Sequence, residues 1–323
     1  MILTYDKTEM AQQAQNLGFN RDNLEKVYRL VEILKFIASN DQLSNRLSLK
    51  GGTMLNLTVL SMPRLSLDID FDFSQPVPKE EVGKQRVVIT QVLTNYLTIN
   101  GYTTRDNQRT LKAADSMTWN YTNSGGTNDS IKIDINYINR FHALPTDNRQ
   151  VLVPWQSNLT VPTLSPLETF ACKISALLDR AKSRDLYDTD NIIKSGLFST
   201  TQERELLRKL VLFYCLIGTK DPLNILKDMR IKPIPQNQIL RELVPVLNKK
   251  QEDRYFNATK STQITQDYLD DLLSFTKDEK LFVNDFFSGQ YHPETIFDEN
   301  ISQRLQNHPM ALLRTSYYAK AGK

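Results

Sequence analysis

The chain contains little cysteine and little histidine, which restricts the chemistry available to it. Only two cysteines, Cys172 and Cys215, occur among 323 residues, and neither belongs to a Cys-x-x-Cys pair. A disulfide framework and a cysteine zinc site are therefore disfavoured. The three histidines, at 142, 292 and 308, lack the spacing of metal ligands, which disfavours a histidine zinc site as well. Any chemistry must then use carboxylates, amines or hydroxyls.

Long apolar runs and a strong excess of one charge are also missing. No stretch approaches the ~18 consecutive apolar residues of a transmembrane helix. The N-terminal segment lacks the basic start and apolar core of a secretory signal. We therefore expect a cytoplasmic protein without membrane contact. The chain has 40 Lys and Arg residues and 37 Asp and Glu residues, so its net charge is only +3. A polyanionic partner would therefore have to bind a local basic patch.

The composition is that of an ordinary globular protein, with 40% hydrophobic and 24% charged residues. At about 150 residues per domain, the length suggests two domains. Strand patterns dominate the first half and helical patterns the second, and prolines at 154, 162 and 166 separate the two. We predict an α+β fold with a mixed-sheet domain over residues 1–160 and a helical domain over residues 161–323.

Hydrophobic periodicity predicts the individual elements. Helical spacing of apolar residues indicates helices over 21–38 and 80–98, and alternation indicates strands over 67–73, 116–121 and 130–138. Further helices are predicted over 167–182, 184–195, 201–217, 237–248, 265–288 and 297–316.

The predicted strand over 67–73 carries one acidic face. Asp68, Asp70 and Asp72 alternate with apolar residues, and carboxylates at i and i+2 of a strand project from the same face. Asp68 and Asp70 can therefore share one or two Mg²⁺ ions, and Asp134 on the strand over 130–138 can complete the set of oxygen ligands. Such a ladder is also typical of a solvated sheet face, but neighbouring like charges need a cation or basic neighbours. We expect Asp72 to lie further away and to pair with a basic side chain.

A glycine pair precedes this strand in the sequence Lys50-Gly51-Gly52-Thr53, just before a helical segment. Glycine allows close backbone approach, and the first N–H groups of a helix favour phosphate. Together with the acidic strand, the segment suits metal-dependent transfer of a nucleotide phosphate. A plain turn is the alternative interpretation of the glycine pair.

A basic stripe is predicted over residues 168–190. Lys173, Arg180 and Arg184 are separated by seven and four residues, which brings them within about 20° of one line if a single helix continues to Arg184. Such a stripe can clamp a triphosphate. Asp185 and Asp188 can orient these cations or cap the next helix. The alternative is an exposed, salt-bridged helix surface.

The segment KGGTMLNLTVLSMPRLSLDIDFDF, residues 50–73, resembles the first motif of the nucleotidyltransferase AbiEii/AbiGii toxin family, which includes the MenT toxins and belongs to the DNA polymerase β nucleotidyltransferase superfamily. The matching positions are Gly51, Gly52, Thr53, Arg64, Leu65, Ser66, Asp68, Asp70 and Phe71. The downstream motif of the family is matched by Lys173, Arg180, Arg184, Asp185 and Asp188. The resemblance covers about residues 46–190.

The resemblance implies a bilobed protein with a nucleotidyltransferase core. It implies Mg²⁺, with Mn²⁺ as a substitute, at Asp68 and Asp70, and NTP contacts from the Gly-Gly-Thr turn, Ser66 and Lys173. Arg64, Arg180, Arg184, Asp185 and Asp188 would complete the nucleotide site. Asp134 as third metal carboxylate follows from the strand pattern.

The resemblance also implies a biological role. Such proteins are toxins of two-gene toxin–antitoxin systems with a cognate antitoxin, and some cause abortive infection against phage. MenT-like members transfer NMP from NTP to the 3′ end of tRNA, whereas AbiEii is linked with GTP binding. Two alternatives stay open: a nucleotidyltransferase that modifies a protein, either itself or its antitoxin, and an NTP-binding protein that is toxic by sequestration.

Two basic and aromatic clusters are candidates for RNA contact. One consists of Lys249, Lys250, Arg254, Tyr255 and Phe256. The other consists of Arg314, Tyr317, Tyr318, Lys320 and Lys323. Solvated helix ends are the alternative explanation of both.

Overall fold

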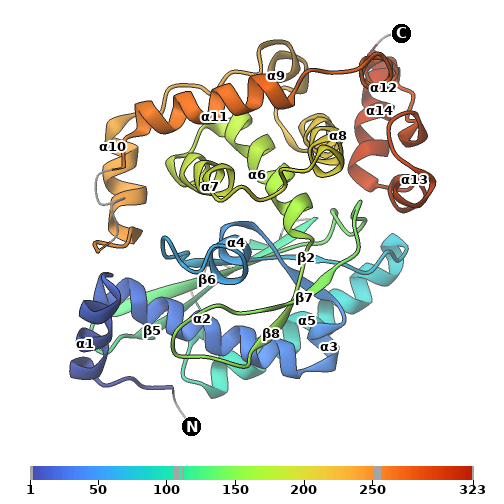
Figure 1. The fold of residues 1–323 in the computed structure, drawn as a ribbon. Helices are drawn as coiled ribbons and strands as arrows, with labels where there is room; N and C mark the ends of the chain where they lie inside the picture. Colours follow the sequence, from blue (N-terminus) through green and yellow to red (C-terminus); the bar gives the residue numbers. More distant parts are fainter. Residues whose placement is uncertain (1–2, 105–108, 111–112, 251–255, 322–323) are drawn as a thin grey trace. The chain divides into compact units, whose positions relative to one another are not determined.

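The computed structural model describes residues 3–104, 109–110, 113–250 and 256–321 (Figure 1). The chain divides into two compact units. The first comprises Met1–Arg140, Thr146–Thr163 and Val244–Phe256, and the second comprises Phe141–Pro145, Leu164–Leu243 and Asn257–Lys323. The chain therefore enters the second unit briefly after Arg140 and returns to the first at Val244, whereas the sequence suggested one continuous range for each domain.

The first unit is built on an eight-stranded mixed sheet, which together with the helices confirms the predicted α+β class. Seven strands follow the order β3-β5-β6-β2-β1-β8-β7, and β4 pairs with β5. β2 runs parallel to β6 and β1 parallel to β8, whereas the other pairs are antiparallel. The strands are β1 (Leu47–Leu49), β2 (Asp68–Phe73), β3 (Thr103–Thr104), β4 (Arg109–Thr110), β5 (Ala114–Thr122), β6 (Asn128–Asn136), β7 (Asp147–Gln150) and β8 (Thr160–Thr163).

The three strands predicted from alternation correspond to β2, β5 and β6. Along β5 and the second half of β6, burial alternates residue by residue because apolar side chains face the core. The β5–β6 connection contains Gly126 with φ of 81°, a left-handed conformation that glycine adopts at little cost.

Helices flank the sheet in the first unit: α1 (Lys7–Leu17), α2 (Arg21–Ser39), α3 (Asp41–Ser44), α4 (Gly51–Thr58) and α5 (Lys79–Ile99). α2 and α5 confirm the helices predicted over 21–38 and 80–98. Asn20 caps α2 by accepting hydrogen bonds from the N–H groups of Asp22 and Asn23. Figure 1 shows α2 and α5 on one side of the sheet and α4 on the other.

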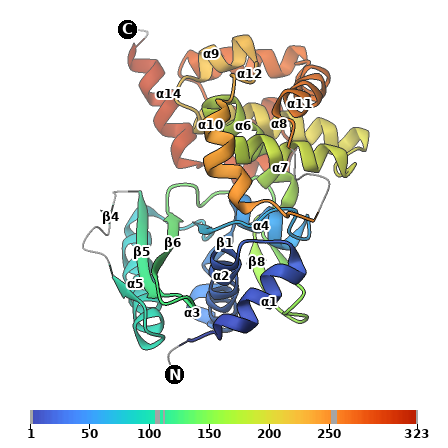
Figure 2. The ribbon, with the colours of Figure 1, turned by 90° about the vertical axis from the view of Figure 1, so that its left-hand side faces the viewer.

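The second unit is helical (Figure 2). Its α-helices are α6 (Pro166–Arg180), α7 (Ser183–Lys194), α8 (Thr201–Gly218), α9 (Pro222–Asp228), α10 (Gln236–Gln238), α11 (Ala258–Leu272), α12 (Lys277–Phe287), α13 (Glu299–Leu305) and α14 (Pro309–Ala321). A π-helical turn, Ile239–Leu243, follows α10, and 3₁₀ turns cover Val244–Val246, in the first unit, and Pro293–Thr295. None of the described helices combines the length and the apolar character needed to span a bilayer.

Three predicted helices are wrong in extent. The helix expected over 265–288 is two helices, because Thr276 starts α12 with a capping box to Glu279. The helix expected over 297–316 is also two, and Pro309 begins the second. The helix expected over 237–248 is a short α-helical turn followed by π and 3₁₀ turns. In each case the apolar spacing continues across a local stop.

Candidate active site

The sheet brings together three of the predicted carboxylates. Asp68 and Asp70 lie on β2, and Asp134 lies on β6, directly opposite Asp70 in the parallel register. Neighbouring strands are about 4.8 Å apart, so side chains at paired positions on one face are neighbours. All three aspartates are half-buried, whereas Ile69 and Ile133 between them are fully buried on the opposite face. We call Asp68, Asp70 and Asp134 the acidic face.

A lysine shares this face. Lys132 lies opposite Asp68 in the register, and its ammonium group donates to Oδ2 of Asp134. Burial favours a lower pKa for Lys132, but the hydrogen bond and charge of Asp134, with the charges of Asp68 and Asp70, give a net rise in the pKa of Lys132. Sequence reasoning had assigned no role to Lys132. The two-residue spacing from Asp134 was the available signal, because it places both side chains on one face.

The fit of the acidic face to a metal ion depends on Asp134. Its Oδ1 atom is buried and has no hydrogen-bond partner among the described residues. A buried carboxylate oxygen without a donor is costly, and a cation would satisfy it. Among the described residues, no group of three or more His, Cys, Asp or Glu side chains is already spaced as a metal cage. The carboxylates are suitable ligands for Mg²⁺ by type and by face, and the metal site stays a prediction.

The glycine turn lies against Asp70. Gly51 has φ of 67°, and a Cβ atom there would lie 3.0 Å from Oδ2 of Asp70. The N–H of Lys50 donates to the Asp70 carbonyl oxygen over 2.9 Å. Thr53 Oγ1 lies 2.9 Å from Ser66 Oγ and within hydrogen-bond distance of the Asp68 carbonyl oxygen. The turn therefore places the N-terminus of α4 beside the acidic face, where its N–H groups favour an anion.

Gly51→Ala should disturb the carboxylate of Asp70 directly. The left-handed backbone costs a non-glycine residue about 1–2 kcal/mol, and the added methyl group meets Asp70 Oδ2. We expect nucleotide transfer to fall about 100-fold, since small misplacements of reacting groups have effects of this order. Gly83→Ala on α5 is the control, because nothing lies within 4 Å of its added Cβ. Equal activity of the two variants would contradict a role for the turn.

Asp72 is the aspartate that stands apart. It is buried, and its Oδ1 atom lies 2.5 Å from the Lys50 ammonium group. Burial raises the pKa of Asp72, and the charge and hydrogen bond of Lys50 partly oppose that rise. The expected pairing of Asp72 with a basic side chain is thus confirmed.

Arg64 and Ser66 are buried below the turn. The Arg64 guanidinium donates to the carbonyl oxygen of Leu65 over 2.9 Å, and Arg64 forms an isolated antiparallel bridge with Leu247. Ser66 is 7% exposed. These contacts support the segment that leads into β2. Contact of Gly52, Thr53, Arg64 and Ser66 with a nucleotide stays a prediction.

The predicted basic stripe of the second unit is wrong in its geometry. Helix α6 ends at Arg180, Ala181 adopts a left-handed φ of 45°, and α7 begins at Ser183. Arg184 consequently belongs to a different helix from Lys173 and Arg180. The break occurs within the segment that the stripe required to be continuous.

A buried ion cluster takes the place of the stripe. The Lys173 ammonium group lies 3.0 Å from Asp185 Oδ1 and 3.1 Å from Asp188 Oδ2. Arg180 Nε lies 2.7 Å from Asp185 Oδ2, and the Arg180 side chain is 57% exposed. Asp185 and Asp188 therefore orient the cations, one of the two roles expected for them. We call these four residues the α6–α7 ion cluster.

The pH dependence of stability should report on this cluster. Burial alone would raise the pKa of Asp185, but Lys173 and Arg180 outweigh it and lower the pKa from 3.8 to about 2. Because the pKa of Asp185 is lower in the folded than in the unfolded protein, its ionised form stabilises the fold at any pH above the unfolded-state pKa. This contribution is lost as the pH falls from about 4 to about 2. The expected loss is about 2 kcal/mol.

Urea denaturation at pH 4 and pH 2 measures this loss. Wild type should lose more stability over the interval than Asp185→Asn, which has no carboxyl group to protonate. Parallel pH profiles for the two proteins would show that Asp185 has an ordinary pKa.

The basic and aromatic clusters are engaged in local contacts where they are described. Lys250 donates to the Asn16 carbonyl oxygen over 2.9 Å, and Arg314 donates to the Thr219 carbonyl oxygen over 2.5 Å. Tyr317 is 68% exposed. Arg254, Tyr255 and Lys323 lie outside the described residues. RNA contact by either cluster stays a prediction.

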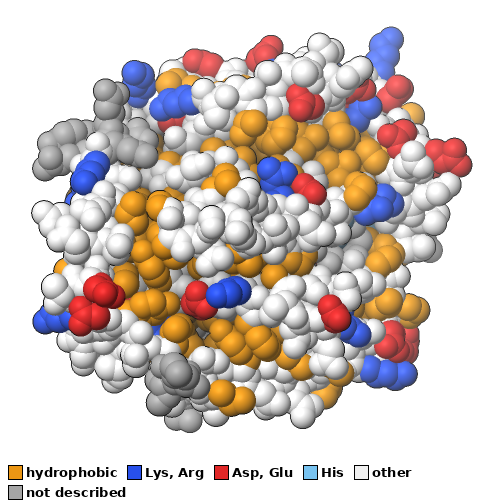
Figure 3. Space-filling view, turned by 60° about the horizontal axis from the view of Figure 1, so that its bottom comes forward, with side chains coloured by type: hydrophobic (Ala, Val, Ile, Leu, Met, Phe, Trp, Pro, Cys, Tyr) orange, Lys and Arg blue, Asp and Glu red, His pale blue; other side chains and the backbone are white. Residues whose placement is uncertain are grey.

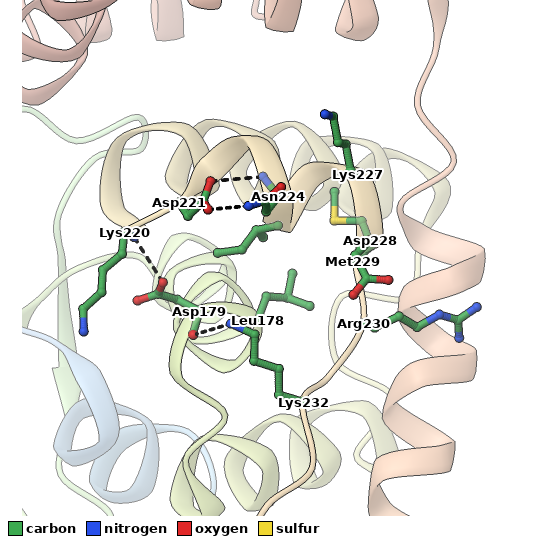
Figure 4. A pocket seen from close by; sticks show the side chains of 11 residues that line it. Leu178, Asp179, Lys220, Asp221, Asn224, Lys227, Asp228, Met229, Arg230 and Lys232 are labelled. Atoms are coloured by element: carbon green, nitrogen blue, oxygen red, sulfur yellow. Dashed lines mark hydrogen bonds between the residues drawn. The ribbon is translucent and has the colours of Figure 1, made fainter.

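The second unit also contains an open pocket of about 750 Å³ beside α9 (Figure 4). Its four cationic side chains stand beside three aspartates, so its charge is nearly balanced. Asp179 accepts a hydrogen bond from the N–H of Lys220, and Lys232 donates to its carbonyl oxygen. The predicted site residues do not line this pocket.

Charged side chains of both signs are scattered over the face of the molecule that Figure 3 shows, in line with the small net charge.

Comparison with known proteins decides the family. The sequence profile described as nucleotidyl transferase AbiEii toxin, type IV TA system, matches residues 32–273. The chain belongs to the AbiEii toxin family. It is a nucleotidyltransferase toxin of a type IV toxin–antitoxin system, which implies an NTP substrate and a cognate antitoxin.

A solved structure has a fold similar to that of this chain. MenT4, a nucleotidyltransferase toxin from Mycobacterium tuberculosis H37Rv, superposes with a TM-score of 0.61 over 95% of this chain and 99% of that chain, at 18% sequence identity. No curated protein matches the chain. The family predicted from the two motifs is confirmed, and so is the class of enzyme.

Proposed function

We propose that this AbiEii-family toxin is a Mg²⁺-dependent enzyme that transfers NMP from an NTP to an RNA acceptor, the 3′ end of tRNA. The observation that carries the proposal is the parallel register of β2 and β6, which sets Asp70 opposite Asp134 and leaves Asp134 Oδ1 buried without a partner among the described residues. Two-metal nucleotidyl transfer uses carboxylates as metal ligands, and the register places two of the candidate ligands on neighbouring strands.

Asp68, Asp70 and Asp134 would hold the metal, with Mn²⁺ able to replace Mg²⁺. When bound, the metal supplies Lewis-acid stabilisation of the attacking and leaving oxygens. N–H groups at the start of α4, beside Gly51, would donate to phosphate oxygens. Asp134 would accept the proton of the acceptor hydroxyl. The hydroxyl oxygen would attack the α-phosphorus of the NTP as the bond from that phosphorus to pyrophosphate breaks.

The α6–α7 ion cluster, which belongs to the second unit, offers cations of the kind that bind a triphosphate. Asp185 and Asp188 fix the buried ammonium group of Lys173, and Arg180 extends an exposed guanidinium from the same cluster. A fixed ammonium and a planar guanidinium are both suited to phosphate oxygens. Arg184, at the start of α7, would add a third cation.

In cells, the protein would act in the cytoplasm, where tRNA and NTP are present. The antitoxin would oppose the loss of functional tRNA, and release of the toxin during phage growth would cause abortive infection. GTP is one of the candidate substrates.

Labelling of total RNA tests the proposed reaction. Purified protein is incubated with each α-³²P-labelled NTP, Mg²⁺ and total RNA, and label should appear in tRNA and disappear with EDTA. The absence of label with every NTP would contradict the proposal. Label on the protein instead of the RNA, detected as an added nucleotide by intact mass, would contradict the RNA acceptor and favour protein modification.

A further inference from the structure

The acidic face contains a cation of its own. Lys132 is the only Lys or Arg in β2, β5 and β6, and it projects from the same face as Asp68, Asp70 and Asp134. Its ammonium group is paired with Oδ2 of Asp134, while Oδ1 of the same carboxylate has no partner among the described residues. Lys132 therefore binds one oxygen of the Asp134 carboxylate, and the proposed metal would bind the same carboxylate.

The neighbouring strand β5 adds no charge beside Lys132. On the β5 side, Ser116 pairs with Asp134 and Thr118 pairs with Lys132 in the register, and neither carries a charge. Lys50, which precedes the glycine turn, forms an ion pair with Asp72. The four side chains considered on β2 and β6 have formal charges of −3, from Asp68, Asp70 and Asp134, and +1, from Lys132.

We propose that Lys132 is a built-in counter-ion that weakens binding of a divalent cation to the acidic face of the nucleotide-free protein and strengthens binding of the nucleotide. This inference rests on the proposed metal-dependent function. A positive charge beside the carboxylates opposes a free divalent cation, and the same charge attracts a triphosphate. Lys132 thereby couples metal loading to arrival of the nucleotide, because the phosphates offset the charge that the lysine adds.

Replacement of Lys132 should change the two affinities in opposite directions. In Lys132→Met, binding of Mn²⁺ alone to the nucleotide-free protein should tighten about tenfold. Binding of a non-hydrolysable NTP analogue at saturating Mn²⁺ should weaken by about the same factor. Lys132→Arg keeps the charge and should stay near wild type in both measurements. A purely structural lysine would not give changes of opposite sign.

A matched control exists at the other end of the same strand. Lys26 forms an ion pair with Asp129 of β6 over 2.7 Å, so Lys26→Met also removes one charge and one strand-linked ion pair. It should leave both affinities unchanged. Should Lys132→Met be too unstable to measure, Lys132→Thr places a residue with high strand propensity at the same position.

The measurement is a titration of free Mn²⁺ by electron paramagnetic resonance, followed by a nucleotide titration. Asp70→Asn identifies the Mn²⁺ that is bound at the acidic face. Opposite shifts in Lys132→Met, absent in Lys26→Met, support the proposal. If Mn²⁺ binds in an Asp70-dependent way with equal affinity in wild type and Lys132→Met, the proposed role of Lys132 is overturned but the metal site is not. The absence of Asp70-dependent Mn²⁺ binding in both proteins would overturn the metal site itself.

Discussion

Asp70→Asn should reduce nucleotide transfer by about 1,000-fold or more, because the proposed metal ion would lose a carboxylate ligand and most of its charge stabilisation would go with it. Asp70 is the carboxylate best placed for this role, because it lies opposite Asp134 and against Gly51. The amide is nearly isosteric, so the fold should survive. Label incorporation into RNA and the melting temperature, measured on the same preparation, separate the two effects.

The control for Asp70→Asn is another strand carboxylate. Asp129→Asn on β6 removes the ion pair with Lys26 but does not touch the acidic face. We expect it to retain activity within a few-fold of wild type, because Asp129 is part-buried at the other end of β6, five residues before Asp134. Transfer by Asp70→Asn at the rate of Asp129→Asn would show that the acidic face is only a solvated sheet surface.

Lys173→Met should destabilise the helical unit by about 3–5 kcal/mol. The side chains of Asp185 and Asp188 are 3% and 0% exposed, and without Lys173 their charges are buried with less compensation. Breaking a buried pair is costly because the remaining charge stays desolvated. Urea denaturation gives the change in the free energy of unfolding.

Two further variants separate this effect from general loss of a lysine. Lys209 of α8 pairs with Glu205, whose side chain is 52% exposed, so Lys209→Met leaves no buried charge and should cost less than about 1 kcal/mol. Combining Lys173→Met with Asp188→Asn should recover part of the lost stability, because one buried charge is removed along with its partner. A cost for Lys173→Met no greater than that for Lys209→Met would contradict the ion cluster as a structural unit.

The strands and the acidic face could be predicted because period-two alternation depends only on neighbouring residues. Asp68, Asp70 and Asp134 were assigned to polar faces on that basis, and the structure places them there. What alternation cannot give is the pairing of β2 with β6, which joins segments about 60 residues apart in the chain. This pairing places Lys132 beside Asp68. Because the pairing could not be predicted, the sequence did not indicate that Lys132 is close to Asp68.

The breaks in the helices could not be predicted for a different reason. Apolar residues keep helical spacing across the ends of α11 and α13, so the periodicity does not show where hydrogen bonding stops. Ala181 is the clearest case, because alanine is a strong helix former but here has a left-handed φ of 45°. Asp185 lies on the far side of this break in the chain and contacts Lys173 and Arg180 before it. These contacts help to offset the backbone strain at Ala181.

Anomalous diffraction from crystals grown with Mn²⁺ and a non-hydrolysable NTP analogue tests the central claim most directly. We predict a manganese peak within about 2.0–2.3 Å of carboxylate oxygens of Asp68 and Asp70, with Asp134 as a further ligand. The triphosphate of the analogue should lie against the same ion. A nucleotide bound with its metal away from these three aspartates would contradict the account.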